Sequence, residues 1–359
     1  MNFTIEISEK TDEDKWIKNL QQNKSSTIYH HPNFSRSYQH IYKSKMIFLH
    51  VYDPNDNIVA QQLLHIFPEY PWHYPSPSIK YISSKLKLGV TLSWFYGPII
   101  FDKQNENKIL ELILKTINDI SKEKNVSLIT GSTTPLNHIS KTPFLSNDYS
   151  VIDWKTYLID LSNPIDYLWN NISKEARNDV TRARKKDVTI HEVKSQSELE
   201  DYVSLLEKHI SNLGIKNKNV RDTIYEEWKY LIYKNNLGKI FLAYAKDKAI
   251  SGLTLLTFNG NIIQQGLTSL KDYRSFLGGP LLTWHVIEWG NNMHYTTFDL
   301  AGANPQSNNK KEKSIDFYKS KWGGRELEHY RCVKIYNKKK STLFSLLKCI
   351  DKTFNHKLN

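Results

Sequence analysis

One pattern of hydrophobic and polar positions occurs once in each half of the chain. Residues Met46 to Phe67 read MIFLHVYDPNDNIVAQQLLHIF, two β-prone runs around a polar turn, which predicts a hairpin. Residues Lys239 to Phe258 read KIFLAYAKDKAISGLTLLTF and predict a second hairpin. Asn259-Gly260 follows at once, and because this dipeptide tolerates positive φ in a tight turn, a further strand is expected over Asn261 to Thr268.

Each half then continues with a strand, a helix and a strand. In the first half the pattern predicts a strand over Leu92 to Phe101, an amphipathic helix over Glu106 to Lys122 and a strand over Val126 to Thr130. In the second half a helix begins near Gly278, and a strand covers Thr296 to Leu300. A duplicated α/β unit explains both halves; a chance similarity of two hairpins is the alternative.

A helical stretch separates the two hairpins. Helices are predicted over 164–186 and 198–233, with a strand over 188–193 between them. Before this stretch, residues 132–150 carry the Pro, Asn and Asp residues of a linker. A domain boundary is therefore expected near Ser150.

The predicted fold class is α/β (α+β), with a first domain over 1–150, a second over 151–337 and a basic tail helix over 338–359. Each domain is expected to be a mixed twisted sheet flanked by helices. The tail can place its apolar side chains on one helical face; these are Leu343, Phe344, Leu346, Leu347 and Ile350. That face would either dock on the body of the protein or make a peripheral membrane contact.

Composition narrows the classes of function. The 49 Lys and Arg residues outnumber the 37 acidic ones, and the net charge of +12 indicates either an anionic partner or a lysine-rich solvated surface. Cys332 and Cys349 have no metal-binding spacing, so neither a metal site nor a disulfide is expected. No signal peptide and no long apolar run is present, and we expect a cytoplasmic monomer.

Familiar enzyme motifs are missing. The sequence has no GxSxG, HExxH, Walker or GxGxxG pattern, which removes the usual hydrolase, zincin, NTPase and dinucleotide-binding classes. Three other segments can carry chemistry.

The first segment is a basic helix that begins at Ser173, a good N-cap, and reads SKEARNDVTRARKKDV. It carries a row of cations beside an apolar stripe; these are Arg177, Arg182, Arg184, Lys185 and Lys186. Guanidinium groups bind phosphate through paired hydrogen bonds, so this helix is a candidate clamp for a diphosphate or a nucleic-acid backbone. The alternative is a solvated basic face.

The second segment is the loop Lys271 to Pro280, KDYRSFLGGP, between a strand and a helix. A helix start leaves N–H groups free, and Gly278 and Gly279 would let a phosphate approach them, with Arg274 close by. An ordinary start of a helix is the other interpretation.

The third segment, Phe298 to Gly324, places Asp299 and Gly302 at the end of a strand and Tyr318-Lys319 on a short helix. Strand ends are where α/β sheets place their sites. A lysine near a reacting carbonyl would stabilise the developing oxyanion, so Lys319 and Asp299 are the candidate catalytic residues. A turn-capping Asp299 and a solvated Lys319 are the alternatives.

In this order the three segments resemble the FemABX-like branch of the GNAT acyltransferase superfamily, from about Leu158 to Val333. The helix LWNNISKEARNDVTRARKKDV is similar to one in that branch. Phe298 to Gly302 is similar to its Tyr/Phe-Asp-x-x-Gly strand, and Tyr318 to Gly323 to its Phe-Lys-x-x-aromatic-Gly motif.

The resemblance implies two tandem GNAT-like domains and transfer of an acyl group to an amine without a metal or a covalent enzyme intermediate. It implies that Lys319 stabilises the tetrahedral intermediate and that Arg177 and its neighbours bind the acceptor, an anionic small molecule or a phosphate-bearing cell-envelope or glycan precursor. It also implies no permanently bound cofactor. The co-substrate is acyl-CoA or aminoacyl-tRNA, which the residues leave open.

Two features depart from the family pattern. Residues 193–239 suffice only for a compact helical pair, without a long coiled-coil arm. Arg274 is followed by Gly278 and Gly279 instead of Arg/Gln-x-x-Gly-x-Gly/Ala. The competing hypothesis is a non-catalytic protein that binds RNA or phospholipid with the helix from Arg177 to Lys186.

Overall fold

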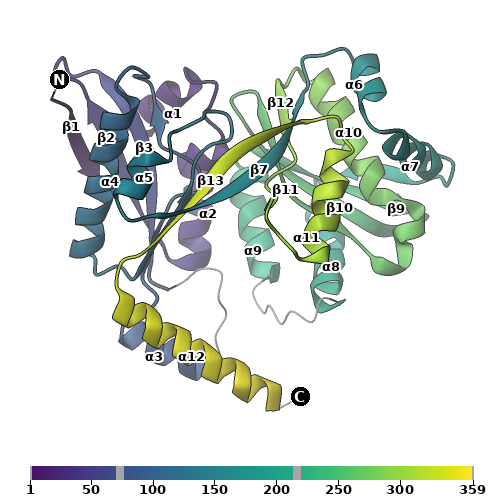
Figure 1. Ribbon diagram of the computed structural model, residues 1–359. Coiled ribbons are helices and arrows are strands. Elements are labelled where there is room, and N and C mark those ends of the chain that lie inside the picture. The colour runs from purple at the N-terminus through teal and green to yellow at the C-terminus, as the bar shows by residue number, and fades with distance from the viewer. Residues whose placement is uncertain (1, 70–76, 213–219, 358–359) are drawn as a thin grey trace. The chain divides into compact units, whose positions relative to one another are not determined.

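The computed structural model describes residues 2–69, 77–212 and 220–357 (Figure 1). The chain forms two compact units. Unit 1 contains residues 1–153 and 329–359, and unit 2 contains residues 154–328. The chain therefore passes from one unit to the other twice, within strands β7 (Ser150–Asp160) and β13 (Arg325–Ile335).

Unit 1 has a mixed sheet in the order β1-β2-β3-β4-β6-β13, and β5 pairs with β3. Its strands are β1 (Thr4–Ser8), β2 (Lys45–Tyr52), β3 (Ile58–Phe67), β4 (Thr91–Ser93), β5 (Ile99–Ile100) and β6 (Leu128–Ser132). Neighbours are antiparallel except β4 and β6, which are joined by the crossover helix α4 (Glu106–Glu123). The other helices are α1 (Glu13–Gln21), α2 (Pro32–Tyr42), α3 (Pro77–Lys85), α5 (Thr142–Ser146) and α12 (Lys338–Lys357).

Unit 2 has the corresponding sheet order, β8-β9-β10-β11-β12-β7. Its strands are β8 (Thr189–Glu192), β9 (Gly238–Ala245), β10 (Lys248–Phe258), β11 (Asn261–Ser269) and β12 (Thr297–Asp299) together with β7. Only β11 and β12 run parallel, and α10 (Gly278–Asn292) connects them. The other helices are α6 (Ile165–Asn171), α7 (Lys174–Arg184), α8 (Gln196–Asn212), α9 (Val220–Glu227), a π-helix (Trp228–Tyr233) and α11 (Lys310–Ser320).

The two sheets confirm the predicted duplication. Both hairpins form, as β2–β3 and β9–β10, and each unit continues with a parallel strand, helix, strand connection. The sixth strand of each sheet is exchanged: β7 leaves unit 1 and pairs with β12, while β13 leaves unit 2 and pairs with β6. This exchange moves the borders of the compact units to Asp153 and Glu328, whereas the sequence placed them at 150 and 337.

Two local predictions were wrong. The continuous strand expected over Leu92 to Phe101 is divided into β4 and β5, because Pro98 has no N–H for a ladder and Gly97 takes a φ of 137°. The linker expected over 132–150 is part of the body of unit 1: it contains α5 and buries Ile139, Phe144 and Tyr149 in the main core.

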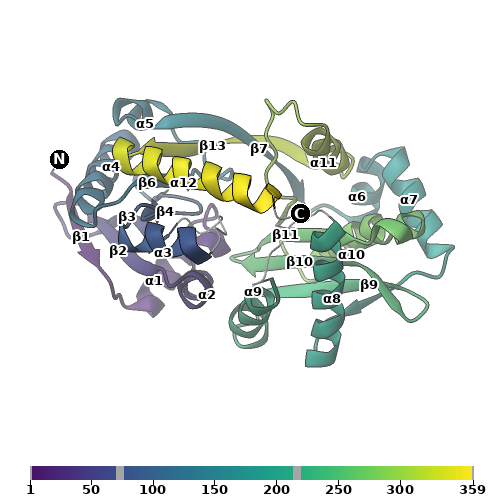
Figure 2. The ribbon, with the colours of Figure 1, turned by 90° about the horizontal axis from the view of Figure 1, so that it is seen from below.

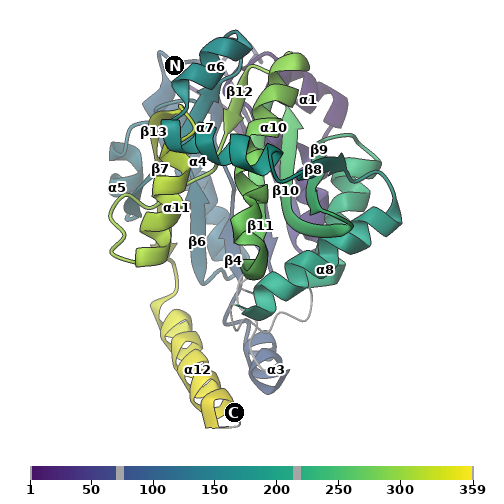
Figure 3. The same ribbon diagram turned by 90° about the vertical axis from the view of Figure 1, so that its right-hand side faces the viewer.

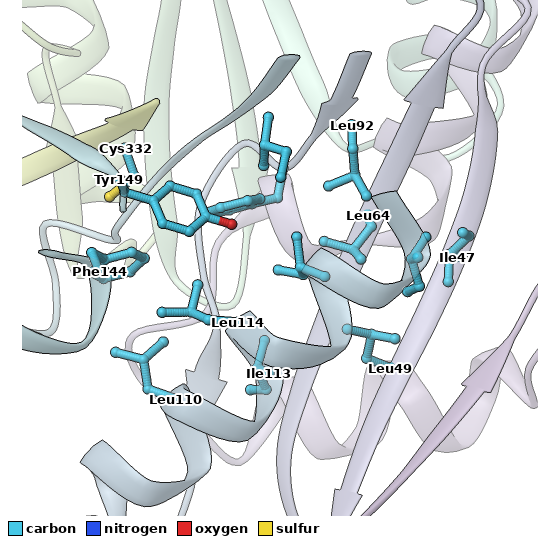
Figure 4. Packing of buried hydrophobic residues seen from close by; sticks show 14 of the residues in the cluster. Ile47, Leu49, Leu64, Leu92, Leu110, Ile113, Leu114, Phe144, Tyr149 and Cys332 are labelled. Atoms are coloured by element: carbon cyan, nitrogen blue, oxygen red, sulfur yellow. The ribbon is translucent and has the colours of Figure 1, made fainter. Parts of the chain in front are cut away.

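The core of unit 1 lies between α4 and the sheet. Leu110, Ile113 and Leu114 follow helical spacing on α4 and point at aliphatic side chains of β2, β3 and β4, with Phe144 and Tyr149 beside them (Figure 4). The predicted helix is thus confirmed almost to the residue.

Unit 2 has helices on both faces of its sheet (Figure 3). On one face, α7 and α10 cover Phe241, Leu253 and their neighbours. On the other face, α8 covers Ile240 and Leu242, with Leu199 and Tyr202 pointing inward. The alternation of the two faces along β9 follows the two-residue period of a strand.

The tail forms a helix, α12, that packs against α3 within unit 1 (Figure 2). Leu343 and Leu346 remain exposed, while Phe344 and Leu347 are half-buried; the side chain of Ile350 lies outside the described residues. Within the described part of the chain, no helix combines the length and the apolar character that crossing a bilayer requires.

Candidate functional site

The sheet of unit 2 opens between its two parallel strands. β11 and β12 pair over three residues only, from Asn261 opposite Thr297 to Ile263 opposite Asp299. Beyond that point β11 continues to Ser269 beside β10, and no described strand pairs with its other edge. Six residues at ~3.4 Å each give an open edge of about 20 Å. A Cβ added to Gly266 would meet nothing within 4 Å, so the face of the sheet is open at this residue of β11.

Asp299 ends β12 at the point where the sheet opens. Its carboxylate accepts hydrogen bonds from the Thr156 hydroxyl and, at 2.8 Å, from the backbone N–H of Ala301. Burial raises the pKa of Asp299, while these hydrogen bonds and the charge of Lys319 act in the opposite direction. Ala301 itself has a φ of 63°. Asp299 thus caps the turn after β12 with a buried carboxyl group.

Lys319, on α11, is a buried ammonium beside this turn. Its Nζ donates to the carbonyl oxygens of Ala301 at 3.0 Å and Gly302 at 2.9 Å, and only 8% of the residue is exposed. Burial lowers its pKa to about 8, opposed by the charges of Asp299 and Asp316. Two of its three N–H donors are engaged by carbonyls, which leaves one for another acceptor.

Gly302 allows this turn to lie close to β7. A Cβ at this position would come within 2.0 Å of Nε1 of Trp154. The Gly of the Phe298 to Gly302 segment is therefore required by packing, and its carbonyl is one of the two that hold Lys319.

A second polar cluster adjoins this turn, and the sequence analysis missed it. Lys155 on β7 donates to Glu326 on β13 at 2.8 Å and to the hydroxyl of Tyr157 at 3.0 Å, and it lies 3.2 Å from Asp316 on α11. Burial acts to lower the pKa of Lys155, but the hydrogen bonds to Glu326, Tyr157 and Asp316 outweigh burial and raise it. The only local signal is that Lys155 and Tyr157, two residues apart, share one face of a strand.

The preceding residue of α11, Tyr318, reaches the first turns of α10. Its hydroxyl lies 2.9 Å from that of Thr283, which in turn donates to the carbonyl of Gly279. Adjacent residues of one helix thus contact two parts of the predicted site: Tyr318 the start of α10, and Lys319 the turn after β12. The Tyr318–Gly323 segment holds these parts together.

The start of α10 has unused N–H groups. The preceding residue, Leu277, has a φ of 61° and makes no side-chain cap. Gly278 and Gly279 lie over the ends of β10 and β11, where an added Cβ would come within 2.7 Å of the Ser251 hydroxyl at Gly278 and 3.1 Å of the Ser269 hydroxyl at Gly279. The two glycines therefore let the helix start pack closely on the ends of β10 and β11. Arg274, on the 3-10 turn Lys271–Phe276, is exposed.

The basic helix α7 forms as predicted, with Ser173 as N-cap and Ala176, Val180 and Ala183 buried. Three cations, two on α7 and one just after it, bind other parts of unit 2. Arg177 donates to the carbonyls of Trp169, Asn170 and Ile172 and closes the end of α6. Arg184 donates to Glu288 on α10, and Lys186 donates to the carbonyl of Ser275 at 2.6 Å.

Lys174 and Arg182 on α7, and Lys185 at its C-cap, are exposed cations for which the described structure contains no ion pair or side-chain hydrogen bond. The contact of Lys186 with Ser275 brings the end of α7 to the loop that carries Arg274. The structure therefore brings together the two segments that were predicted to bind phosphate. The RNA- or phospholipid-binding hypothesis requires a face of unpaired cations. Arg177, Arg184 and Lys186 are already paired with acceptors of the protein, which leaves fewer cations for such a face.

One pocket in the described part of the protein lies elsewhere, in unit 1. It has a volume of about 400 Å³ and is lined by residues of β1, α1, β2 and β3 and the intervening loop. None of the predicted site residues lines it.

No protein-family model and no curated protein sequence matches the chain. Solved structures do match it over nearly its whole length. The crystal structure of FemX aligns with a TM-score of 0.67 and 11% identity, covering 95% of this chain and 99% of that one. A tandem GNAT protein from the clavulanic acid biosynthesis pathway aligns with a TM-score of 0.57 and 6% identity, covering 94% and 99%.

L-PGS from Bacillus licheniformis aligns with a TM-score of 0.53 and 11% identity, covering 95% of this chain and 96% of that one. At these identities the similarity establishes the fold. The chain has a FemABX-like fold of two tandem GNAT-related units, as the sequence resemblance implied.

Proposed function

We propose that this tandem GNAT-like chain is an N-acyltransferase, which moves an acyl or aminoacyl group from an activated donor to an amine of a phosphate-bearing acceptor. The observation that carries the proposal is Lys319, a buried ammonium held by two carbonyls where the unit 2 sheet opens. Burying an ammonium group costs desolvation free energy. Buried groups with shifted pKa values therefore occur often at functional sites.

The chemistry needs few groups. The acceptor nitrogen attacks the donor carbonyl carbon, a C–N bond forms, and the carbonyl oxygen becomes an oxyanion. The remaining N–H of Lys319 stabilises this oxyanion. The intermediate collapses by breaking the C–S bond of a thioester or the C–O bond of a tRNA ester, and the nitrogen releases its proton to the leaving group or to water. Holding donor and acceptor together supplies a large share of the rate.

The two ends of the open edge fit a long donor. The free N–H groups of Gly278 and Gly279 suit a phosphate group, and Arg274 lies on the preceding turn. The reacting carbonyl would lie near Asp299, up to about 20 Å away along β11. Acyl-CoA and aminoacyl-tRNA both combine phosphates with a distant acyl carbon.

The direct test is transfer itself. Purified protein is incubated with radiolabelled acetyl-CoA and, separately, with radiolabelled aminoacyl-tRNA, each with an amino-sugar nucleotide and with a precursor extract as acceptors. Label in the acceptor identifies the donor class. Labelled product that forms equally fast with a Lys319→Met variant would remove the site from the proposal.

Activity should depend on pH through Lys319. Its pKa of about 8 means that the ammonium is present below about pH 8 and is lost above it. Because the charged form stabilises the oxyanion, kcat/KM should fall about tenfold per pH unit above this value. In Lys319→Arg the guanidinium keeps its charge, so this alkaline limb should disappear. A rate that instead rises through pH 8 in the wild type only would identify the neutral amine as a base.

Acceptor binding should depend on the exposed cations of α7. We expect Arg182→Gln with Lys185→Gln to raise the KM for a phosphate-bearing acceptor about tenfold at low salt and to change kcat little. Arg177→Gln is the contrasting variant: it removes bonds to α6 and should lower the melting temperature. An unchanged KM in the double variant at low ionic strength would assign Arg182 and Lys185 to a solvated face.

A further inference from the structure

Unit 1 carries an exposed surface that combines apolar and basic side chains on two packed helices, α3 and α12. We call it the α3/α12 surface. Its apolar members are Tyr81, Ile82, Leu86, Leu343 and Leu346. Tyr81 is 66% exposed and Leu346 56%, and these exposed side chains gather on two packed helices instead of standing singly.

The exposed residues of α12 follow helical spacing. Lys339, Leu343 and Leu346 are separated by four and three residues and share one face. Phe344 and Leu347 are half-buried. The helix thus has its inner apolar contacts and, in addition, an apolar face that unit 1 does not cover.

The charge of the surface has one sign. Lys85, Lys87, Lys338, Lys339 and Lys340 lie on these two segments, and residues 77–90 and 338–350 contain no Asp or Glu. Lys340 donates to the carbonyl of Lys87 and fixes the start of α12. Burial, and then the neighbouring charge of Lys87, lowers the pKa of Lys340, as expected where cations gather without counter-charges.

We propose that the α3/α12 surface binds the surface of an anionic lipid bilayer. Interfacial helices combine leucines and aromatics with lysines in this way: the apolar side chains enter the acyl boundary, and the ammonium groups reach the headgroups. A nucleic acid would leave the leucines uncovered. A second copy of the chain would bring two lysine-rich faces together, which the lack of acidic residues over 77–90 and 338–350 disfavours.

This inference goes beyond acyl transfer and does not depend on it. It places the protein at a membrane through the α3/α12 surface. A lipid-linked acceptor and the protein would then diffuse on the same membrane surface.

The test is flotation of the full chain with vesicles of phosphatidylcholine alone or with about one third phosphatidylglycerol. We expect binding to the anionic vesicles only, weakened by salt. Leu343→Gln with Leu346→Gln should lower the partition coefficient at least about tenfold. Lys338→Gln with Lys339→Gln should lower it about 25-fold at low salt, or about fivefold per lysine.

Met293→Gln is the matched control, because Met293 is 59% exposed but lies in unit 2, and it should bind vesicles like the wild type. All variants are checked for native circular dichroism. Equal binding by the wild type and the leucine variant, or no binding to anionic vesicles, would overturn the proposal. So would a dimer in sedimentation that the leucine variant abolishes, since it would assign the surface to self-association.

Discussion

Replacing Lys319 by methionine should reduce the rate of acyl transfer about 10²–10³-fold, with little change in the KM of the donor. Methionine has nearly the length of lysine but offers no N–H to a developing oxyanion. The carbonyls of Ala301 and Gly302 also lose their donor, so a loss of stability of about 1–3 kcal/mol is expected as well.

The measurement must therefore separate catalysis from folding. Transfer rates are compared under conditions in which circular dichroism shows both proteins fully folded. Lys313→Met is the matched control, because Lys313 is on the same helix and exposed. A folded Lys319→Met protein with wild-type kcat would show that Lys319 serves only to hold the turn after β12.

Replacing Asp299 by alanine should lower the free energy of unfolding by about 1–3 kcal/mol, because two buried hydrogen-bond donors lose their acceptor. The carboxylate accepts from Thr156 and from the N–H of Ala301, and its charge favours the ammonium of Lys319. Removing the carboxyl group leaves the Thr156 hydroxyl and the Ala301 N–H without this acceptor. It also removes a charge that favours the ammonium form of Lys319. The turn that positions Lys319 should also lose its order, so activity should fall with stability.

Urea denaturation measures this change, with Asp119→Ala as control. Asp119 is an exposed residue in the middle of α4, and its removal should alter the unfolding free energy by less than about 0.5 kcal/mol. Asp299→Asn tests the role further, since an amide oxygen still accepts hydrogen bonds but carries no charge. An alanine variant as stable as the wild type would contradict the buried network.

Much of the fold could be predicted because the relevant signals are local. The helix α4 follows from apolar residues three and four apart, the α7 start from the side chain of Ser173, and the turn after β10 from Asn259-Gly260. These interactions lie within a few residues of each other. The duplication could also be predicted, because the same hairpin pattern of two β-prone runs occurs at 46–67 and at 239–258.

The site was predicted only as a set of segments. Asp299, Lys319, Gly278, Gly279 and Arg274 were named from their places at strand ends and helix starts. Their partners were not, because Thr156 lies 143 residues from Asp299 in sequence, and Lys155 lies 171 residues from Glu326. Contacts between residues so far apart in the chain produce no local pattern from which they could be predicted.

The sequence by itself determined the two hairpins, the helices α4, α7 and α10, and that two similar α/β units follow one another. Only the tertiary structure decided that β7 and β13 change units, that Arg177 binds the end of α6, and that Lys319 lies buried against two carbonyls. Secondary structure follows from side-chain periodicity and short-range hydrogen bonds. The desolvation and pairing of a charge depend on residues that only folding brings together.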